Sequence, residues 1–70
     1  MRINNGLGAM PKPDTNRRNI VDRLHSEGWV NEGGSKHDLY RHPDKGITIV
    51  PRHKELTVGV ARSIARAAGW

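Results

Sequence analysis

The sequence predicts a single small α+β domain with the element order helix, strand, strand, strand, helix. Its 70 residues leave room for one domain only. Apolar residues recur at helical spacing near both ends of the chain, and runs of β-branched and aromatic residues, separated by glycine and proline, lie between them. Short turns make the strands antiparallel, so we expect a three-stranded antiparallel sheet with both helices on one face and the other face open.

Residues 1–13 have the composition of a tail, because they hold two glycines, two prolines and two asparagines and their apolar residues follow no regular period. We expect a disordered tail over residues 1–13 and a folded domain over residues 14–70. No apolar stretch reaches the roughly 20 residues of a membrane-spanning helix, and the N-terminus lacks the pattern of a secretory signal. A cytoplasmic protein is therefore expected. The absence of cysteine excludes disulfides and thiolate metal sites.

The first helix is predicted over residues 16–27. Its apolar side chains form one stripe: Ile20, Val21 and Leu24. Asp14 or Thr15 is expected to supply the N-cap oxygen, since the two prolines just before them disfavour helix. Gly28 stands where a left-handed C-cap belongs.

Strand-forming residues and turn residues alternate after this helix. Three strands are predicted at residues 29–30, 35–41 and 47–50. Pro51 ends the third strand, and a final helix over residues 57–68 precedes a capping glycine, Gly69. We expect Trp29 and Tyr40 to lie in the core, because so small a domain needs the area that they bury.

The charge favours a polyanionic partner. Twelve Lys and Arg residues face seven Asp and Glu residues, and the sequence pI is about 10.5. A basic surface that serves only solubility fits the charge equally well. Arg52 and Lys54, which flank His53, are the better candidates for phosphate contacts, whereas Arg62 and Arg66 are more typical of a solvated helix face.

A glycine-rich turn over residues 33–37 carries Lys36 and His37 into a strand, where backbone amides and an ammonium group can approach a phosphate. RNA cleavage needs a base for the 2′-hydroxyl, cations near the phosphate and an acid for the departing oxygen, so a histidine among cations is chemically sufficient. The same pattern also occurs in polar hairpins without a catalytic role. His53 is a second candidate for proton transfer or phosphate contact, and it fits equally well as a loop residue at the end of the third strand.

No metal site or cofactor is predicted. His37 and His42 are five positions apart, which places them on opposite faces of a strand. The other two histidines show no zinc-site spacing, and the sequence holds no phosphate-binding loop or dinucleotide fingerprint.

The order and spacing of several short motifs resemble the HicA toxins, also called YcfA-like mRNA interferases. The motifs are Gly28-Trp29, GSKHDLYRHP over residues 34–43, IVPRH over 49–53, GVARSI over 59–64 and Ala68-Gly69. The resemblance extends from about residue 19 to the last residue. One departure is Lys36, which stands between serine and histidine where many members have the two adjacent. A second is the N-terminal tail, which the shortest members lack.

The resemblance implies a fold like that of double-stranded-RNA-binding domains, and a metal-independent endoribonuclease that cleaves mRNA with a single histidine. A HicB-like antitoxin is the implied protein partner. Carried onto this chain, His37 is the catalytic residue, with Lys36 and Arg41 assisting at the phosphate and Ser35 orienting the turn. Two other hypotheses stay open at this point: an RNA-binding module that does not cleave, and an interaction protein whose only partner is the antitoxin.

Overall fold

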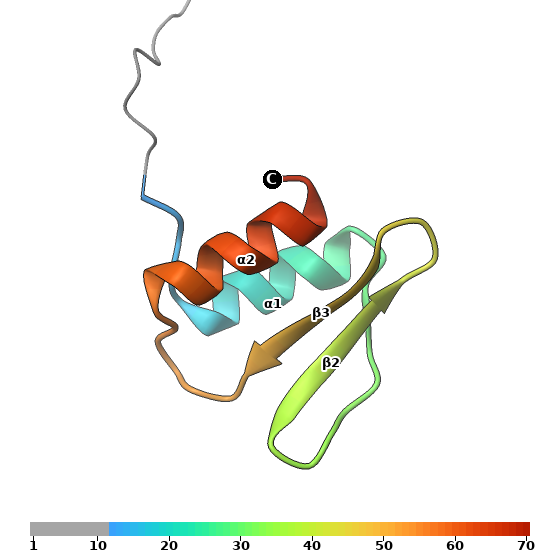
Figure 1. Ribbon diagram of the computed structural model, residues 1–70, viewed down its shortest axis with the longest axis horizontal. Helices are drawn as coiled ribbons and strands as arrows, with labels where there is room; N and C mark the ends of the chain where they lie inside the picture. The colour runs from blue at the N-terminus through green and yellow to red at the C-terminus, as the bar shows by residue number, and fades with distance from the viewer. Residues whose placement is uncertain (1–11) are drawn as a thin grey trace, which may run out of the picture.

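The computed structural model describes residues 12–70 and has the predicted α+β architecture (Figure 1). In chain order the elements are α1 (Arg17–Ser26), β1 (Val30–Asn31), β2 (His37–His42), β3 (Gly46–Pro51) and α2 (Val58–Ala68). The expected tail lies outside the described residues except for its last two, so the prediction of disorder stays a prediction. Among the described helices, none is long and apolar enough to cross a membrane.

The three strands form one antiparallel sheet in the order β1-β2-β3. In the main hairpin His37 pairs with Pro51 at the open end and His42 pairs with Gly46 at the turn. Alternation along β2 and β3 separates two faces. One face is buried and carries Asp38, Tyr40, Thr48 and Val50; the other is more exposed and carries His37, Leu39, Arg41, Ile47 and Ile49.

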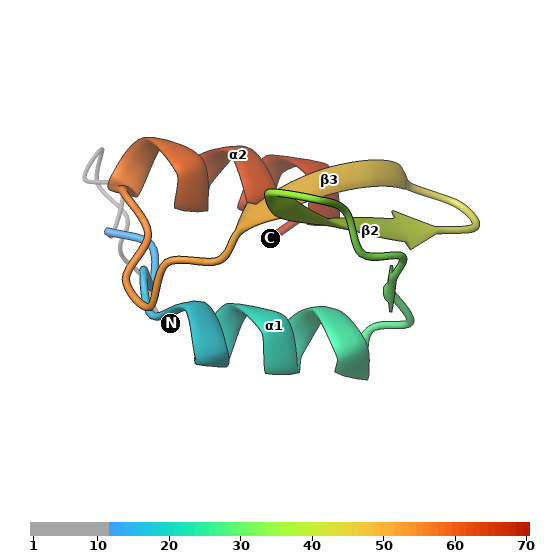
Figure 2. The same cartoon turned by 90° about the horizontal axis from the view of Figure 1, so that it is seen from below.

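Both helices supply side chains to the core that covers the buried face of the sheet. The core consists of Ile20, Leu24, Trp29, Tyr40, Val50, Leu56, Ala61, Ile64 and Ala68. This confirms the predicted core positions of Trp29 and Tyr40, which are only 2% and 1% exposed. The two helices run in the same direction through the molecule (Figure 1, Figure 2), and the opposite face of the sheet is left open, as expected.

The two helices end in the same way, at a glycine followed by a tryptophan. Trp29 donates its N–H to the carbonyl of Leu24 (3.0 Å), and Trp70 donates to that of Ala65 (2.8 Å). Gly28 and Gly69 have φ values of 93° and 80°, the left-handed conformation that this Schellman ending requires. The predicted capping role of both glycines is thus confirmed.

The N-cap of α1 was predicted one or two residues too early. The cap is Asn16, whose side chain accepts a hydrogen bond from the N–H of Asn19 (3.0 Å). The carbonyl of Thr15 accepts the N–H of Leu56 (2.8 Å) from a segment 41 positions further along the chain. Asp14 accepts instead from the N–H of Asn16 (2.9 Å). Pairing with a distant segment therefore delays the start of the helix.

The strands differ from their predicted bounds by one or two residues. β1 begins after Trp29, because the N–H of this residue still belongs to the helix ending described above. β2 begins at His37 rather than Ser35 because the glycine turn extends to Lys36. β3 includes Pro51, which pairs with His37 as its last residue. Such a terminal position suits a residue without an N–H donor.

Substitution of Leu24 with alanine should lower the free energy of unfolding by about 2–5 kcal/mol, because Leu24 is fully buried between the helix and the sheet and its removal leaves a cavity. Urea denaturation followed by circular dichroism measures this loss. A loss below about 1 kcal/mol, within the range of surface substitutions, would contradict the core described above.

Candidate functional site

Two segments that are far apart in the sequence meet at the open end of the main hairpin (Figure 1). One is the turn over residues 33–36 that leads into β2, and the other is the segment 52–54 that follows β3. They are neighbours because the first residue of β2, His37, pairs with the last residue of β3, Pro51. Six of the residues predicted for the site lie in these two segments or at the start of β2, namely Ser35, Lys36, His37, Arg52, His53 and Lys54. Direct contacts join Arg52 to the turn, and the carbonyl of Lys54 accepts the N–H of Arg17 at the start of α1 (3.1 Å).

The His37 side chain is exposed on the open face of the sheet. The residue is nevertheless anchored, because it is the first residue of a six-residue strand and pairs with Pro51. An exposed imidazole on a fixed backbone is accessible to a ligand without a rearrangement of the core. Lys36 precedes it in the turn and is also exposed.

His42 has a structural environment instead. Its Nδ1 accepts the N–H of Asp44 (3.1 Å), and its Nε2 lies 3.1 Å from the carbonyl oxygen of Glu27. These partners assign the tautomer with a proton on Nε2. The ring also contacts Trp29, with centroids 5.2 Å apart. The predicted placement of His37 and His42 on opposite faces of the strand is confirmed.

Arg52 binds the turn and the adjacent strand at the same time. Its Nε and Nη2 donate to Oδ1 of Asp38 at 3.0 and 2.8 Å. Nη2 also donates to the carbonyl of Gly34 (2.5 Å), and Nη1 donates to that of Ser35 (3.3 Å). The side chain is 45% exposed although all three of its nitrogens are hydrogen-bonded. Its predicted phosphate contact stays a prediction.

Asp38 is the buried centre of this ion-pair cluster. Its carboxylate is 12% exposed and also receives a hydrogen bond from Nη2 of Arg17 at 2.7 Å. Arg17 reaches it from the first turn of α1 and donates through Nε to the carbonyl of Pro51 (2.8 Å). The hydrogen bonds from Arg52 lower the pKa of Asp38 below its ordinary value of 3.8, against the opposing effect of burial.

Gly34 permits the close approach of the turn to β2. A Cβ atom at this position would lie 2.3 Å from the carbonyl oxygen of His37, and the φ of Gly34 is 151°. Any other residue would therefore have to push the backbone of the turn away from the strand. Position 34 therefore requires glycine because the backbone carbonyl of His37, the candidate catalytic residue, lies so close to it.

Arg41 lies on the same open face as His37 but four residues further along β2, which corresponds to about 13 Å. Its Nε donates to both carboxylate oxygens of Glu32 at 3.0 Å. The structure does not bring Arg41 and His37 to one phosphate group. Both could contact RNA only if the strand of RNA ran along β2.

The open face is apolar beyond His37. Val30, Ile47 and Ile49 are 60%, 49% and 43% exposed. Val30 and Ile47 both pair with Arg41, from opposite sides of the central strand, which places the three apolar side chains on one surface. Contiguous exposed apolar side chains of this kind mark interaction surfaces.

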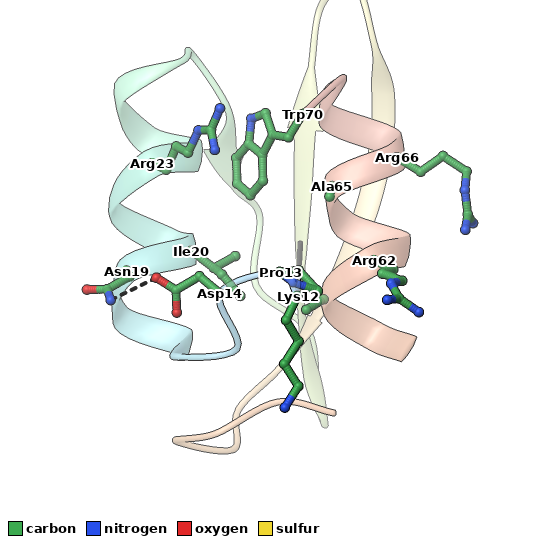
Figure 3. A pocket seen from close by; sticks show the side chains of 11 residues that line it. Lys12, Pro13, Asp14, Asn19, Ile20, Arg23, Arg62, Ala65, Arg66 and Trp70 are labelled. Atoms are coloured by element: carbon green, nitrogen blue, oxygen red, sulfur yellow. Dashed lines mark hydrogen bonds between the residues drawn. The ribbon is translucent and has the colours of Figure 1, made fainter. Parts of the chain in front are cut away.

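A hollow of about 600 Å³ lies between α1 and α2 (Figure 3). Trp70 stands at one end of it beneath the guanidinium of Arg23, which lies 4.2 Å from the ring centroid. Arg62 and Arg66 extend from α2 away from α1, as expected of a solvated helix face (Figure 3). None of the predicted site residues lines this hollow.

Sequence reasoning missed Asp38 and Arg17 as parts of the site. The sequence did contain a signal, because Asp38 and Tyr40 are two positions apart and therefore point to the same face of a strand. A carboxylate on the core side of a sheet needs a cationic partner. Which arginines supply the partner depends on the register, which local sequence does not specify.

The fold and site define a small basic α+β domain with an exposed histidine at one end of an open sheet. The family model described as HicA toxin of bacterial toxin-antitoxin systems matches residues 17–70, and the chain belongs to this family of toxins. No curated protein and no solved structure matches the chain. Membership implies that the protein is the toxin of a toxin–antitoxin system and has a cognate antitoxin partner.

Substitution of Asp38 with asparagine should lower the free energy of unfolding at pH 7 by about 1–3 kcal/mol, because charge-assisted hydrogen bonds to two arginines are lost. A depressed pKa in the folded state stabilises the protein above the unfolded-state pKa, and this stabilisation disappears as the pH falls through the folded-state value. The stability difference between parent and variant should therefore shrink below about pH 4. A difference that stayed constant between pH 7 and pH 3 in urea titrations would contradict this account.

Proposed function

We propose that this HicA-family toxin is a metal-independent endoribonuclease that cleaves mRNA, with His37 as the catalytic residue. The observation that carries the proposal is the position of the His37 imidazole, exposed on an anchored backbone directly after Lys36, in a turn that Arg52 contacts. Family membership supports a toxin, and the positive charge supports a polyanionic substrate.

The proposed reaction is an internal transfer at one phosphate. Neutral His37 accepts the proton of the 2′-hydroxyl, and the resulting oxygen attacks phosphorus. The bond from phosphorus to the 5′-oxygen breaks, and that oxygen takes a proton from an acid, which leaves a 2′,3′-cyclic phosphate and a free 5′-hydroxyl. Lys36 and Lys54 stabilise the charge that builds on the phosphate oxygens. If His37 is protonated at the start, it serves as the acid and another group serves as the base.

His53 is our candidate for the second proton-transfer group. It is exposed and lies two residues beyond Pro51, the strand partner of His37.

The antitoxin partner is proposed to be a HicB-like protein that covers the open face of the sheet. The exposed apolar residues Val30, Ile47 and Ile49 support this choice of surface. Because His37 lies on the same face, a partner bound there would exclude RNA without any change in the catalytic residue.

Replacement of His37 by alanine should abolish growth arrest in an inducible bacterial host and lower the RNA cleavage rate of the purified protein by about 100-fold or more. The variant should fold normally, because the side chain is exposed. Growth, total mRNA integrity and single-turnover cleavage are the measurements. His25→Ala is the matched control, since His25 is exposed on α1 and its ring makes a T-shaped contact with Tyr40, 5.5 Å between centroids.

Arrest and cleavage by His37→Ala at the parent's rates would show that His37 is not catalytic. Tight RNA binding by the folded parent without any cleavage would instead favour the non-catalytic RNA-binding module. Binding to the antitoxin without affinity for RNA would favour a protein whose only role is that interaction.

Binding of the antitoxin should slow amide hydrogen exchange over residues 35–41, because this segment forms part of the surface that the partner is proposed to cover. Exchange in α2, which packs on the buried side of the sheet, provides the internal reference. Mass spectrometry of the free and bound toxin makes the comparison. An unchanged segment 35–41 together with slower exchange in α2 would place the interface on the helices and overturn the proposal.

A further inference from the structure

We propose that Arg52 is a positioning residue that holds the turn before His37 in its working geometry, through Asp38 on one side and the turn carbonyls on the other. The proposal rests on the function proposed above and assigns Arg52 a role distinct from phosphate binding.

The contacts of Arg52 lie on both sides of His37 in the sequence. The carbonyls of Gly34 and Ser35 precede the histidine, at 2.5 and 3.3 Å from the guanidinium, and the carboxylate of Asp38 follows it, at 2.8 Å. One rigid group thus joins the backbone before the histidine to the side chain after it. This arrangement fixes the direction of the His37 Cα–Cβ bond without contact to the imidazole.

The turn needs such a constraint because two glycines give it conformational freedom. Gly33 and Gly34 have φ values of 75° and 151°, which only glycine adopts readily. The other hydrogen bonds that hold the turn involve Gly33: its N–H donates to Oδ1 of Asn31 (2.7 Å), and its carbonyl accepts the N–H of Leu39 (3.0 Å). Arg52 supplies the contacts to the next two residues. Proton transfer is sensitive to displacements of about 1 Å, so the order of this turn affects the rate.

Asp38 is a fixed anchor for the guanidinium. Its carboxylate is buried and is also held by Arg17, which in turn donates to the carbonyl of Pro51. Arg17 offers a comparison within the chain, because it pairs with the same carboxylate but contacts neither turn carbonyl. Loss of Arg17 removes an ion pair of similar length and leaves the contacts between Arg52 and the turn in place.

A lysine at position 52 separates positioning from phosphate binding. Lysine keeps the positive charge but lacks the planar fork that reaches a carboxylate and two carbonyls together. If Arg52 acts through the turn, Arg52→Lys should lower kcat nearly as much as Arg52→Gln does. If Arg52 acts by contact with RNA phosphate, the lysine should preserve most of the RNA affinity.

The experiment uses the full-length chain and compares Arg52→Lys, Arg52→Gln and Arg17→Gln at a temperature where circular dichroism shows each to be folded. Amide exchange of Gly33 and Leu39, whose N–H groups donate the hydrogen bonds that hold this turn, is followed by NMR, together with the imidazole signals of His37. We expect both Arg52 variants to exchange at least about 10-fold faster in this turn and to shift the imidazole signals, while Arg17→Gln stays within about 3-fold of the parent.

Cleavage is measured on the same proteins, with Arg23→Gln as the control because its ion pair with Glu27 is remote from the turn. Both Arg52 variants should lower kcat by about 10-fold to 100-fold and leave KM within about 3-fold. The RNA affinity of both Arg52 variants, measured with His37→Ala added to prevent cleavage, should also stay within about 3-fold of the value without the Arg52 substitution.

Normal exchange in the turn of both Arg52 variants would overturn the proposal. Normal kcat in Arg52→Lys, with weakened RNA affinity in Arg52→Gln, would also overturn it and assign Arg52 to phosphate binding. Failure of the proposed function has a different signature, namely full cleavage by His37→Ala alone. In that case the exchange data would still decide whether Arg52 holds the turn.

Discussion

The carboxylate of Asp38 is the constraint on which this end of the molecule depends. It lies on the buried face of the sheet, where an unpaired charge would cost several kcal/mol. Two arginines neutralise it, Arg17 from the first turn of α1 and Arg52 from the segment after β3. Burial of one acidic group therefore fixes the relative positions of a helix start, a strand start and a strand end, which are the elements that surround the candidate site.

The alternation of β2 divides structural from functional side chains. Asp38, Tyr40 and His42 point toward the helices and take part in ion pairing, core packing and helix capping. His37 and Arg41 point to the open face and contribute nothing to the core. A ligand or protein partner on the open face can thus be bound at little cost to folding. This separation lets a domain with so small a core present a candidate catalytic histidine on its surface.

Local patterns were sufficient to predict the order of the elements and the core position of Trp29, whereas the role of His37 stays a prediction. Residues such as Leu24, Trp29 and Gly28 carry this information, because helix periodicity and glycine endings depend on neighbours in sequence. The N-cap at Asn16 and the link from Arg52 to Asp38 depend on pairing between segments that are far apart, so no local pattern contains them. The roles of Ser35, Lys36, His53 and Lys54 in RNA contact remain predictions.

The register of β2 also explains how this chain accommodates Lys36 between Ser35 and His37. The strand begins only at His37, so the additional residue lies in the turn, where Gly33 and Gly34 adopt positive φ values. Within the strand, Asp38 and Tyr40 must face the core, and alternation then requires His37 to face outward. The orientation of the imidazole is set by the residues that follow it, and the distance from the preceding serine does not determine it.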